Sequence, residues 1–256
     1  MTTSATFPQF MVKRALAFVL FACASLSFLS AHAENEKYAS IVVDMDSQQV
    51  LHDRFADSPR YPASITKVMT LYMVFDALDE GELTLDEKLP VSAEASRAQP
   101  SKLGLRPGST ITVEDAILAL VTKSANDVAV VVAERLGGSE SRFGALMTVK
   151  ARALGMENTR FYNAHGLPDA RQVTTARDLS KLAVRLMEDH GKYYNYFSTK
   201  TFNWGPATYG NHNKLLGSVP GVDGIKTGYT RASGYNLIAT AERNAHRVIA
   251  MGSGLG

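Results

Sequence analysis

Two residues at the start of one apolar run have the types and spacing of a catalytic pair. Ser64 and Lys67 stand three places apart within residues 61–67, and apolar residues recur at three- and four-residue steps from Ile65 to Leu78. This periodicity predicts a helix, and residues three apart share one helix face. A serine hydroxyl is a good nucleophile only when a base takes its proton, and a lysine serves as that base when its surroundings disfavour the ammonium form. We therefore interpret Ser64 as a nucleophile and Lys67 as its base.

The same pair has a simpler interpretation, in which Ser64 caps a helix and Lys67 is a solvated side chain of its first turn. For an isolated S-x-x-K this interpretation is the more common one. Two further stretches argue against it: Ser124-Ala125-Asn126 follows the apolar run 116–121, and Lys226-Thr227-Gly228 lies in a strand-like segment further along the chain. Motifs of the types S-x-x-K, S-x-N and K-T-G are the set of serine β-lactamases and penicillin-binding proteins. All three occur here in that order.

The resemblance to one family extends beyond these short motifs. Over residues 36–256 the chain resembles the D-alanyl-D-alanine carboxypeptidases, which are low-molecular-mass penicillin-binding proteins. The stretches that match the family's pattern are Pro62-Ala63-Ser64-Ile65-Thr66-Lys67-Val68-Met69-Thr70, Ser124-Ala125-Asn126-Asp127, Phe161-x-Asn163-x-His165-Gly166-Leu167, Thr175-Ala176-Arg177-Asp178-Leu179 and Asp223-Gly224-Ile225-Lys226-Thr227-Gly228. The resemblance implies an α/β (α+β) fold of the β-lactamase/transpeptidase type: an antiparallel sheet flanked by helices, with a helical subdomain inserted before the K-T-G strand. It implies an active site between the two parts.

The resemblance also implies roles for the motif residues. Ser64 would attack the carbonyl between the two terminal D-alanines of a peptidoglycan stem peptide, and Lys67 would take its proton. Ser124 would pass a proton toward the leaving D-alanine, while Asn126 would orient Lys67 and the substrate amide. β-Lactams are expected to acylate Ser64 as covalent inhibitors.

The K-T-G strand is expected to bind the substrate's end. Lys226 and Thr227 would hold the terminal carboxylate, a charge-assisted contact that fits an enzyme cutting at a free C-terminus. The backbone N–H groups of Ser64 and Tyr229 would form the oxyanion hole. Gly228, which stands between Thr227 and Tyr229, would belong to the same substrate-binding strand. Many family members carry histidine where Tyr229 stands. Because the backbone N–H of this residue does the work, the difference affects side-chain contacts there and not the reaction.

Other functions stay open on the sequence alone. A serine β-lactamase of class A uses a glutamate on a loop between the S-x-N and K-T-G motifs. No glutamate occurs between Asn158 and Asp178, so we expect β-lactams to leave Ser64 slowly. A D,D-endopeptidase would carry the same three motifs. A catalytically inactive wall-binding protein is disfavoured by the complete set of motif residues.

The N-terminus predicts export. Lys13 and Arg14 precede an apolar run over residues 15–29, and Ala31-His32-Ala33 offers small residues at the two positions that a signal peptidase reads. A transmembrane anchor is the alternative, but the run is shorter than the ~20 residues that a spanning helix needs. We expect residues 1–33 to be a signal peptide, and residues 34–256 to be a catalytic domain that is periplasmic or cell-wall-associated, without an integral membrane anchor.

Composition excludes several kinds of chemistry. The chain has one cysteine, Cys23, inside the predicted signal peptide, so the mature protein has no thiol for catalysis, disulfides or zinc. Loss of Lys13 and Arg14 takes 27 basic residues to 25, against 25 acidic ones, and leaves a formally neutral protein. The histidines show no metal-ligand spacing, and no basic stripe carries interleaved aromatics. We expect no metal, no cofactor and no nucleic-acid partner.

The helices and strands expected around the motifs are predicted from short-range patterns in the sequence. Residues 38–45 and 49–55 predict a hairpin, and Tyr235–Arg243 with His246–Gly252 predicts a second one, turning at Asn244-Ala245. Further helices are expected after the N-cap Thr112, from Asn126-Asp127 as caps to Gly137, over 139–154, and from 174 to about 189; residues 161–169 are expected to form a loop, and 221–230 a strand.

Three further expectations concern surfaces. We interpret Gly224 and Gly228 as places where an extended substrate lies close to the strand. The acidic residues after the first helix are expected to be a solvated helix end and loop without chemistry; they are Asp76, Asp79, Glu80, Glu82, Asp86 and Glu87. The last hairpin alternates apolar residues on both faces, so we expect a helix beyond Gly256 to be needed to cover the back of the sheet, and residues 34–256 to lack it.

Overall fold

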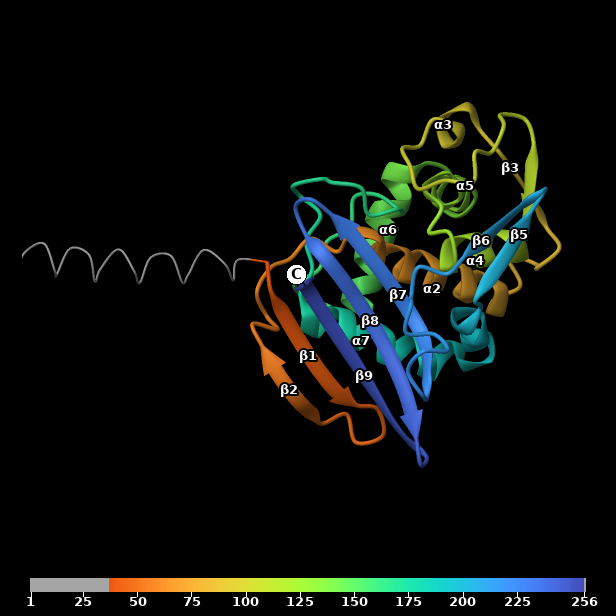
Figure 1. The fold of residues 1–256 in the computed structure, drawn as a ribbon. Helices are drawn as coiled ribbons and strands as arrows, with labels where there is room; N and C mark the ends of the chain where they lie inside the picture. Colours follow the sequence, from red (N-terminus) through yellow and green to blue (C-terminus); the bar gives the residue numbers. More distant parts are fainter. Residues whose placement is uncertain (1–36, 256) are drawn as a thin grey trace, which may run out of the picture. The chain divides into compact units, whose positions relative to one another are not determined.

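One five-stranded sheet forms the base of the fold. The computed structural model describes residues 37–255, and the predicted signal peptide lies outside them. All neighbouring strands are antiparallel, in the order β2-β1-β9-β8-β7 (Figure 1). Their bounds are β1 Ala39–Asp44, β2 Val50–Arg54, β7 Val222–Thr230, β8 Gly234–Arg243 and β9 His246–Leu255. The predicted antiparallel sheet and both hairpins are confirmed.

The helices lie in the long segment between β2 and β7, as the predicted inserted subdomain requires (Figure 1). They are η1 Ala63–Ile65, α2 Thr66–Asp79, α3 Ala93–Ser96, α4 Val113–Val121, α5 Asn126–Gly137, α6 Glu140–Ala153, α7 Ala176–His190 and η2 Gly191–Ser198. Two small two-stranded sheets were not predicted: β3 Lys88–Pro90 with β4 Thr110–Thr112, and β5 Thr201–Trp204 with β6 Ala207–Gly210. Among residues 37–255, no helix is both long and apolar enough to cross a bilayer.

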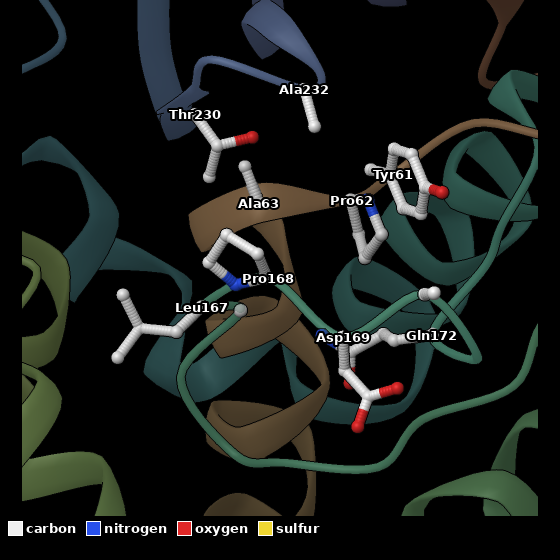
Figure 2. Close-up of a pocket in the computed structure, with 11 residues that line it drawn as sticks. Tyr61, Pro62, Ala63, Leu167, Pro168, Asp169, Gln172, Thr230 and Ala232 are labelled. Carbon is white, nitrogen blue, oxygen red and sulfur yellow. The ribbon is translucent and has the colours of Figure 1, made fainter.

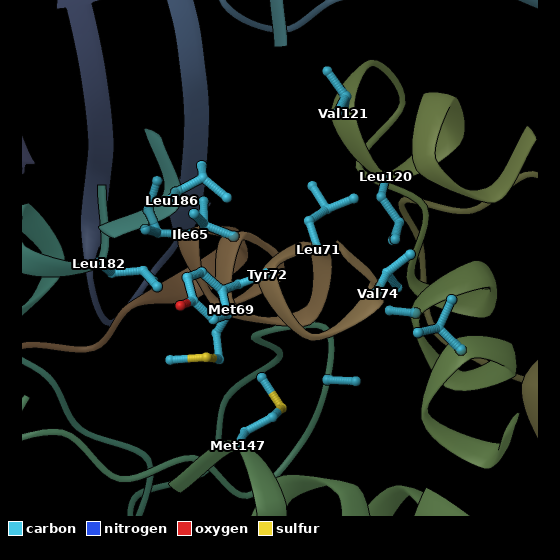
Figure 3. Close-up of a cluster of buried hydrophobic side chains, with 14 of the residues drawn as sticks. Ile65, Met69, Leu71, Tyr72, Val74, Leu120, Val121, Met147, Leu182 and Leu186 are labelled. Atoms are coloured by element: carbon cyan, nitrogen blue, oxygen red, sulfur yellow. The ribbon is translucent and has the colours of Figure 1, made fainter. Parts of the chain in front are cut away.

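The helix that follows Ser64 is the centre of the core. Nearly every residue of α2 from Thr66 to Ala77 is buried, so this helix is enclosed on all sides rather than amphipathic. Its neighbours in the buried cluster come from α4, α6 and α7 (Figure 3); those labelled are Leu120, Val121, Met147, Leu182 and Leu186. Because α2 is packed on every side, residues on its first turn are held in fixed positions.

Side-chain caps fix where four of the other helices begin, and the hydroxyl of Ser92 is the cap of α3. The hydroxyls of Thr112, Ser139 and Thr175 accept from the backbone N–H groups three residues later, at the starts of α4, α6 and α7. Helix α5 ends at Gly137, and the C-cap Gly138 has a φ of 75°, the left-handed conformation that favours glycine. The Asn244-Ala245 turn also has positive φ at both residues, 52° and 60°, which matches the right-handed twist of a hairpin.

The two faces of the sheet differ. On one face, α7 packs against β1 and β9, over side chains such as Ile41, Ile249 and Met251. The opposite face carries partly exposed side chains, among them Val42, Val248 and Ala250. The expected covering helix beyond Gly256 is not tested by these residues and stays a prediction.

The acidic residues at the end of α2 and beyond it are not all solvated, so that prediction was wrong in part. Asp76 accepts from His190 Nε2 at 3.2 Å, and Asp79 accepts from His190 Nδ1 at 2.9 Å. Lys150 and Lys192 pair with the same carboxylates. His190 is 4% exposed, so these carboxylates hold a buried ring between α2 and α7.

Candidate active site

Ser64 lies on a short turn that opens onto a cleft. The turn is η1, and α2 follows it directly. Ala63 has a φ of 47°, a strained value for a residue with a side chain, and strain of this kind is common at functional sites. Neither η1 nor α2 has a side-chain cap, so the Ser64 hydroxyl does not serve as an N-cap. It lines a cleft of about 370 Å³.

Lys67 lies beneath Ser64 and makes three contacts. Its Nζ is 3.3 Å from Ser64 Oγ, 2.7 Å from Asn126 Oδ1 and 2.6 Å from the carbonyl oxygen of His165. The side chain has no exposed surface. Burial, and then the positive charge of Lys226, hold the pKa of Lys67 well below its usual value. A neutral amine has two N–H donors and one lone pair. Two of the three contacts of Lys67 Nζ are to carbonyl oxygens, which only accept, so they use both N–H donors. The lone pair is then left for Ser64.

The turn between α4 and α5 brings the second motif to the cleft. Ser124 has a φ of 58°, and its Oγ is buried without a hydrogen-bond partner among residues 37–255. Asn126 Nδ2 donates to the carbonyl oxygen of Gln99, which turns Oδ1 toward Lys67. Since a buried hydroxyl without a hydrogen-bond partner is energetically costly, Ser124 Oγ is available to bind a polar group that enters the cleft.

The predicted capping role of Asn126 and Asp127 was wrong. The N-cap of α5 is Ala125, which makes no side-chain capping bond. The carboxylate of Asp127 is fully buried and instead accepts from the backbone N–H groups of Leu103, Gly104 and Leu105. It therefore fixes the position of this loop, which comes before the S-x-N turn in the chain.

The third motif forms the wall that faces Ser64. Thr227, Gly228 and Tyr229 line the cleft from β7, an edge strand of the sheet. Lys226, like Lys67, is buried and does not line the cleft: it is 1% exposed, lies behind this wall, and its Nζ donates to the carbonyl oxygen of Thr227. Burial lowers the pKa of Lys226 to about 7.

The glycines of β7 serve internal packing, and the predicted contact of a substrate with them stays a prediction. A Cβ on Gly228 would lie 2.9 Å from the backbone nitrogen of Ser64. A Cβ on Gly224 would clash with the hydroxyl of Tyr194. Gly228 thus allows β7 to approach the nucleophile turn closely, and Gly224 makes room for an aromatic ring.

The profile of the Peptidase_S11 family, described as D-alanyl-D-alanine carboxypeptidase, matches residues 28–253. The chain belongs to this family. The D-alanyl-D-alanine carboxypeptidase DacF of Bacillus subtilis is 33% identical over 225 residues, which cover 85% of this chain and 57% of the relative. A D-alanyl-D-alanine endopeptidase of Pseudomonas aeruginosa is 33% identical over 212 residues, with 78% of this chain and 65% of the relative covered.

Solved carboxypeptidase-family structures have the same fold. Penicillin-binding protein D2 of Listeria monocytogenes, in its ampicillin-bound form, matches with a TM-score of 0.78 and 35% identity, over 85% of this chain and 89% of that protein. The predicted β-lactamase/transpeptidase-like class is confirmed. The chain spans about half the length of the curated carboxypeptidases it matches, as the 57% for DacF illustrates.

Two site residues of this carboxypeptidase-family chain had no predicted role. His165 lines the cleft, and its ring Nδ1 accepts from the backbone N–H of Leu167. The proton of a neutral ring must then be on Nε2, which lies 3.1 Å from Glu140 Oε1. Glu140 thus orients the residue whose carbonyl oxygen binds Lys67. The sequence places His165 within a family motif but gives no sign of its distant partner.

The cleft also contains groups that were not predicted at all. His212 lies at its wall, where partial burial, followed by the charges of Lys226, Lys123 and other lysines, lowers the pKa of the imidazole to about 4. Tyr235 lines the mouth, with its ring centroid 4.5 Å from that of Tyr229. Of the described residues that line the cleft, none is Asp or Glu. Among the described residues, neutral groups therefore line the cleft, with the buried Lys67 and Lys226 behind them, and no carboxylate of the lining repels an anionic ligand.

Proposed function

We propose that this chain is a serine-type D-Ala-D-Ala carboxypeptidase, which removes the terminal D-alanine from peptidoglycan stem peptides through an acyl-enzyme on Ser64. One observation carries the proposal. The buried amine of Lys67 contacts Ser64 Oγ and donates to two carbonyl oxygens, an arrangement that leaves its lone pair free to take the serine proton. Family membership makes the D-Ala-D-Ala terminus the substrate of choice.

Acylation follows from this geometry. As Ser64 Oγ forms its bond to the scissile carbonyl carbon, its proton moves to Lys67 Nζ. The backbone N–H groups of Ser64 and Tyr229 stabilise the oxyanion, and the close approach of β7 to η1 at Gly228 supports that pairing. When the C–N bond breaks, the proton passes from Lys67 through the Ser124 hydroxyl to the amine of the leaving D-alanine. Water then hydrolyses the ester and restores Ser64.

Strand β7 recognises the free C-terminus of the substrate. The terminal carboxylate binds the hydroxyl of Thr227 and the ammonium group of Lys226. Because burial lowers the pKa of Lys226 to about 7, a bound carboxylate shifts this lysine toward its charged form. Substrate binding is thereby coupled to protonation of Lys226, while Lys67 stays neutral.

β-Lactams are covalent inhibitors in this account. They acylate Ser64 as the substrate does, but their ring-opened leaving group stays attached. The described cleft wall has no carboxylate to activate a deacylating water, so the acyl-enzyme is long-lived. This disfavours the β-lactamase alternative. The protein acts after export and cleavage near Ala33, in the periplasm or at the cell wall, where it trims stem peptides during wall synthesis and shaping.

An endopeptidase that cuts peptidoglycan cross-links is the second candidate, because one relative carries that name. The test offers the protein a pentapeptide ending in D-Ala-D-Ala and, separately, a cross-linked muropeptide dimer. We expect release of D-alanine from the pentapeptide, loss of that release in Ser64→Ala, and slow or no cleavage of the dimer. Cleavage of the dimer alone would favour the endopeptidase, and no turnover of either would contradict the proposed function.

A further inference from the structure

A buried asparagine of β8 contacts the chain just before the nucleophile turn. Asn236 is 2% exposed and does not line the cleft, and its Nδ2 donates to the carbonyl oxygen of Tyr61 at 2.9 Å. Tyr61 stands three residues before Ser64. The residue before it, Arg60, exchanges two backbone hydrogen bonds with Thr174, of 2.7 and 2.9 Å. The chain that enters the turn is therefore fixed at two successive residues, once by backbone and once by a side chain.

Strand β9 determines which way the Asn236 amide faces. The oxygen Oδ1 accepts from Ser253 Oγ at 2.8 Å and from the backbone N–H of Gly254 at 3.3 Å. A backbone N–H only donates, so the atom that faces it must be the amide oxygen, and the amide N–H₂ group must face Tyr61. The carbonyl of Tyr61 only accepts. This position therefore needs a donor at one end of the side chain and an acceptor at the other, which an asparagine provides.

Asn236 also joins the two parts that supply the proposed oxyanion hole. Its backbone stands opposite Gly228 of β7, next to Tyr229. The turn η1 packs against both β7 and β8, and Gly228 lies so close to it that a Cβ there would be 2.9 Å from the backbone nitrogen of Ser64. Through its strand pairing Asn236 is thus tied to the N–H of Tyr229, and through its side chain it is tied to the turn that carries the N–H of Ser64.

The conformation of the turn requires support from its surroundings. Ala63 has a φ of 47°, and such a conformation persists in a residue with a side chain only where neighbouring groups hold it. Figure 2 shows Ala63 between the end of β7, marked by Thr230, and the loop that carries Leu167. A Cβ on Gly166 of this loop would clash with the carbonyl group of Ala63. Packing thus holds the turn from two sides, and the hydrogen bond to Tyr61 fixes the point where the chain enters it.

We propose that Asn236 is a positioning residue for acylation: its amide holds the carbonyl of Tyr61 and thereby keeps the backbone N–H of Ser64 aligned with that of Tyr229. This inference rests on the proposed function of the cleft. A misplacement of about 1 Å at a reacting group costs on the order of 100-fold in rate. Loss of the hydrogen bond to Tyr61 should therefore slow the chemical step, while the initial binding of a substrate or a penicillin changes little.

The test uses Asn236→Asp, which keeps the shape of the side chain and the acceptor that faces β9. Its carboxyl group donates to the Tyr61 carbonyl only while it is protonated, a form that burial favours. The acylation rate constant and the dissociation constant of the non-covalent complex are measured with a penicillin. At pH 5 we expect a rate constant within about threefold of that of the unmodified protein, and at pH 9 one at least about tenfold lower. The dissociation constant should change less than about threefold at either pH.

Two further variants separate positioning from stability. Asn236→Leu has no donor at any pH, so its rate constant should be at least about tenfold lower at both pH 5 and pH 9. Ser180→Ala removes a buried hydroxyl of α7 that donates to the carbonyl oxygen of Arg177 and lies outside the cleft lining. It controls for the loss of a buried hydrogen bond, and both of its constants should stay within about threefold of those of the unmodified protein.

Either the pH dependence of Asn236→Asp or its advantage over Asn236→Leu at pH 5 decides the question, so neither variant has to be stable at every pH. Equal rate constants for Asn236→Asp and Asn236→Leu at pH 5 would overturn the positioning role. So would a ratio of Asn236→Asp to unmodified protein that is the same at pH 5 and pH 9, or an equal loss in Ser180→Ala. Failure of the proposed function looks different, because the unmodified protein would then form no acyl-enzyme and release no D-alanine.

Discussion

The amine of Lys67 and the hydroxyl oxygen of Ser64 lie 3.3 Å apart, on consecutive turns of one buried segment. This distance permits proton transfer once the amine is neutral, and the surroundings of Lys67 favour the neutral form. In the proposed function, the serine at the cleft and the lysine beneath it act as one unit.

Lys67 should be the neutral lysine of the site. NMR of the lysine side chains should find its pKa well below 10.5, because burial and Lys226 both disfavour the ammonium form. Lys67→Met should reduce penicillin acylation by about 10²-fold or more, with little change in the melting temperature. Lys88→Met, at an exposed position, is the matched control and should acylate normally. A Lys67 that titrates near its usual pKa would refute this assignment.

Glu140 should adjust the charge of Lys67. Its carboxylate lies behind His165 and opposes the lowering of the Lys67 pKa that burial and Lys226 cause. Glu140→Gln removes this negative charge, so the rise of acylation rate with pH should move to lower pH. Glu157→Gln, at an exposed carboxylate one helix away, should leave the profile in place. If Glu140 only supports the fold, the rate will fall without any shift in the profile.

Much of the fold could be predicted because its signals are local. The run after Ser64, the caps Thr112 and Thr175, and the Asn244-Ala245 turn each depend on neighbours within a few residues. The three motifs likewise identified the cleft, since their residue types are informative together. Residues Ser64, Ser124 and Asn126 do line it.

The errors share one physical cause, which is contact between residues distant in sequence. Asp127 has the residue type of a helix cap, but the loop at Leu103–Leu105 supplies better donors. Asp76 and Asp79 lie at a helix end, where exposure to solvent is the usual expectation. Both instead accept hydrogen bonds from His190, which belongs to another helix. Periodicity and spacing do not encode such pairings, so Glu140 and His212 could not be found either.

The Asp127 contacts should be important for stability. Asp127→Asn keeps the shape of the side chain but turns an N–H₂ group toward the backbone donors of the loop. We expect a loss of about 3 kcal/mol in the free energy of unfolding, measured with denaturant, because buried donors lose a charged acceptor. Asp86→Asn, at an exposed carboxylate, should cost less than about 0.5 kcal/mol. Equal stabilities of the two variants would contradict the role given to Asp127.

His190 should make stability depend on pH. Both ring nitrogens face carboxylate oxygens, which only accept, so the ring binds as the imidazolium ion. Burial opposes the charge, but the hydrogen bonds to Asp76 and Asp79 outweigh it and raise the pKa of His190. A raised folded pKa gives a contribution that is complete below about pH 6.5 and is lost as the pH rises through the folded value.

The matching experiment compares His190→Gln with the unmodified protein at pH 5 and at pH 9. The difference in unfolding free energy should be about 2 kcal/mol at pH 5 and smaller at pH 9. His246→Gln is the control, since that side chain is 78% exposed. A difference that is the same at both pH values would show that the charge of His190 contributes nothing.

The most direct test of the catalytic assignment is to locate the acyl group. The protein is exposed briefly to a penicillin, digested, and mapped by mass spectrometry. We predict one penicilloyl group per chain, on the peptide that carries Ser64, and none in Ser64→Ala, whose melting temperature should be nearly unchanged. An adduct on another serine such as Ser124, or no adduct on a folded protein, would contradict the assignment of Ser64 as the nucleophile.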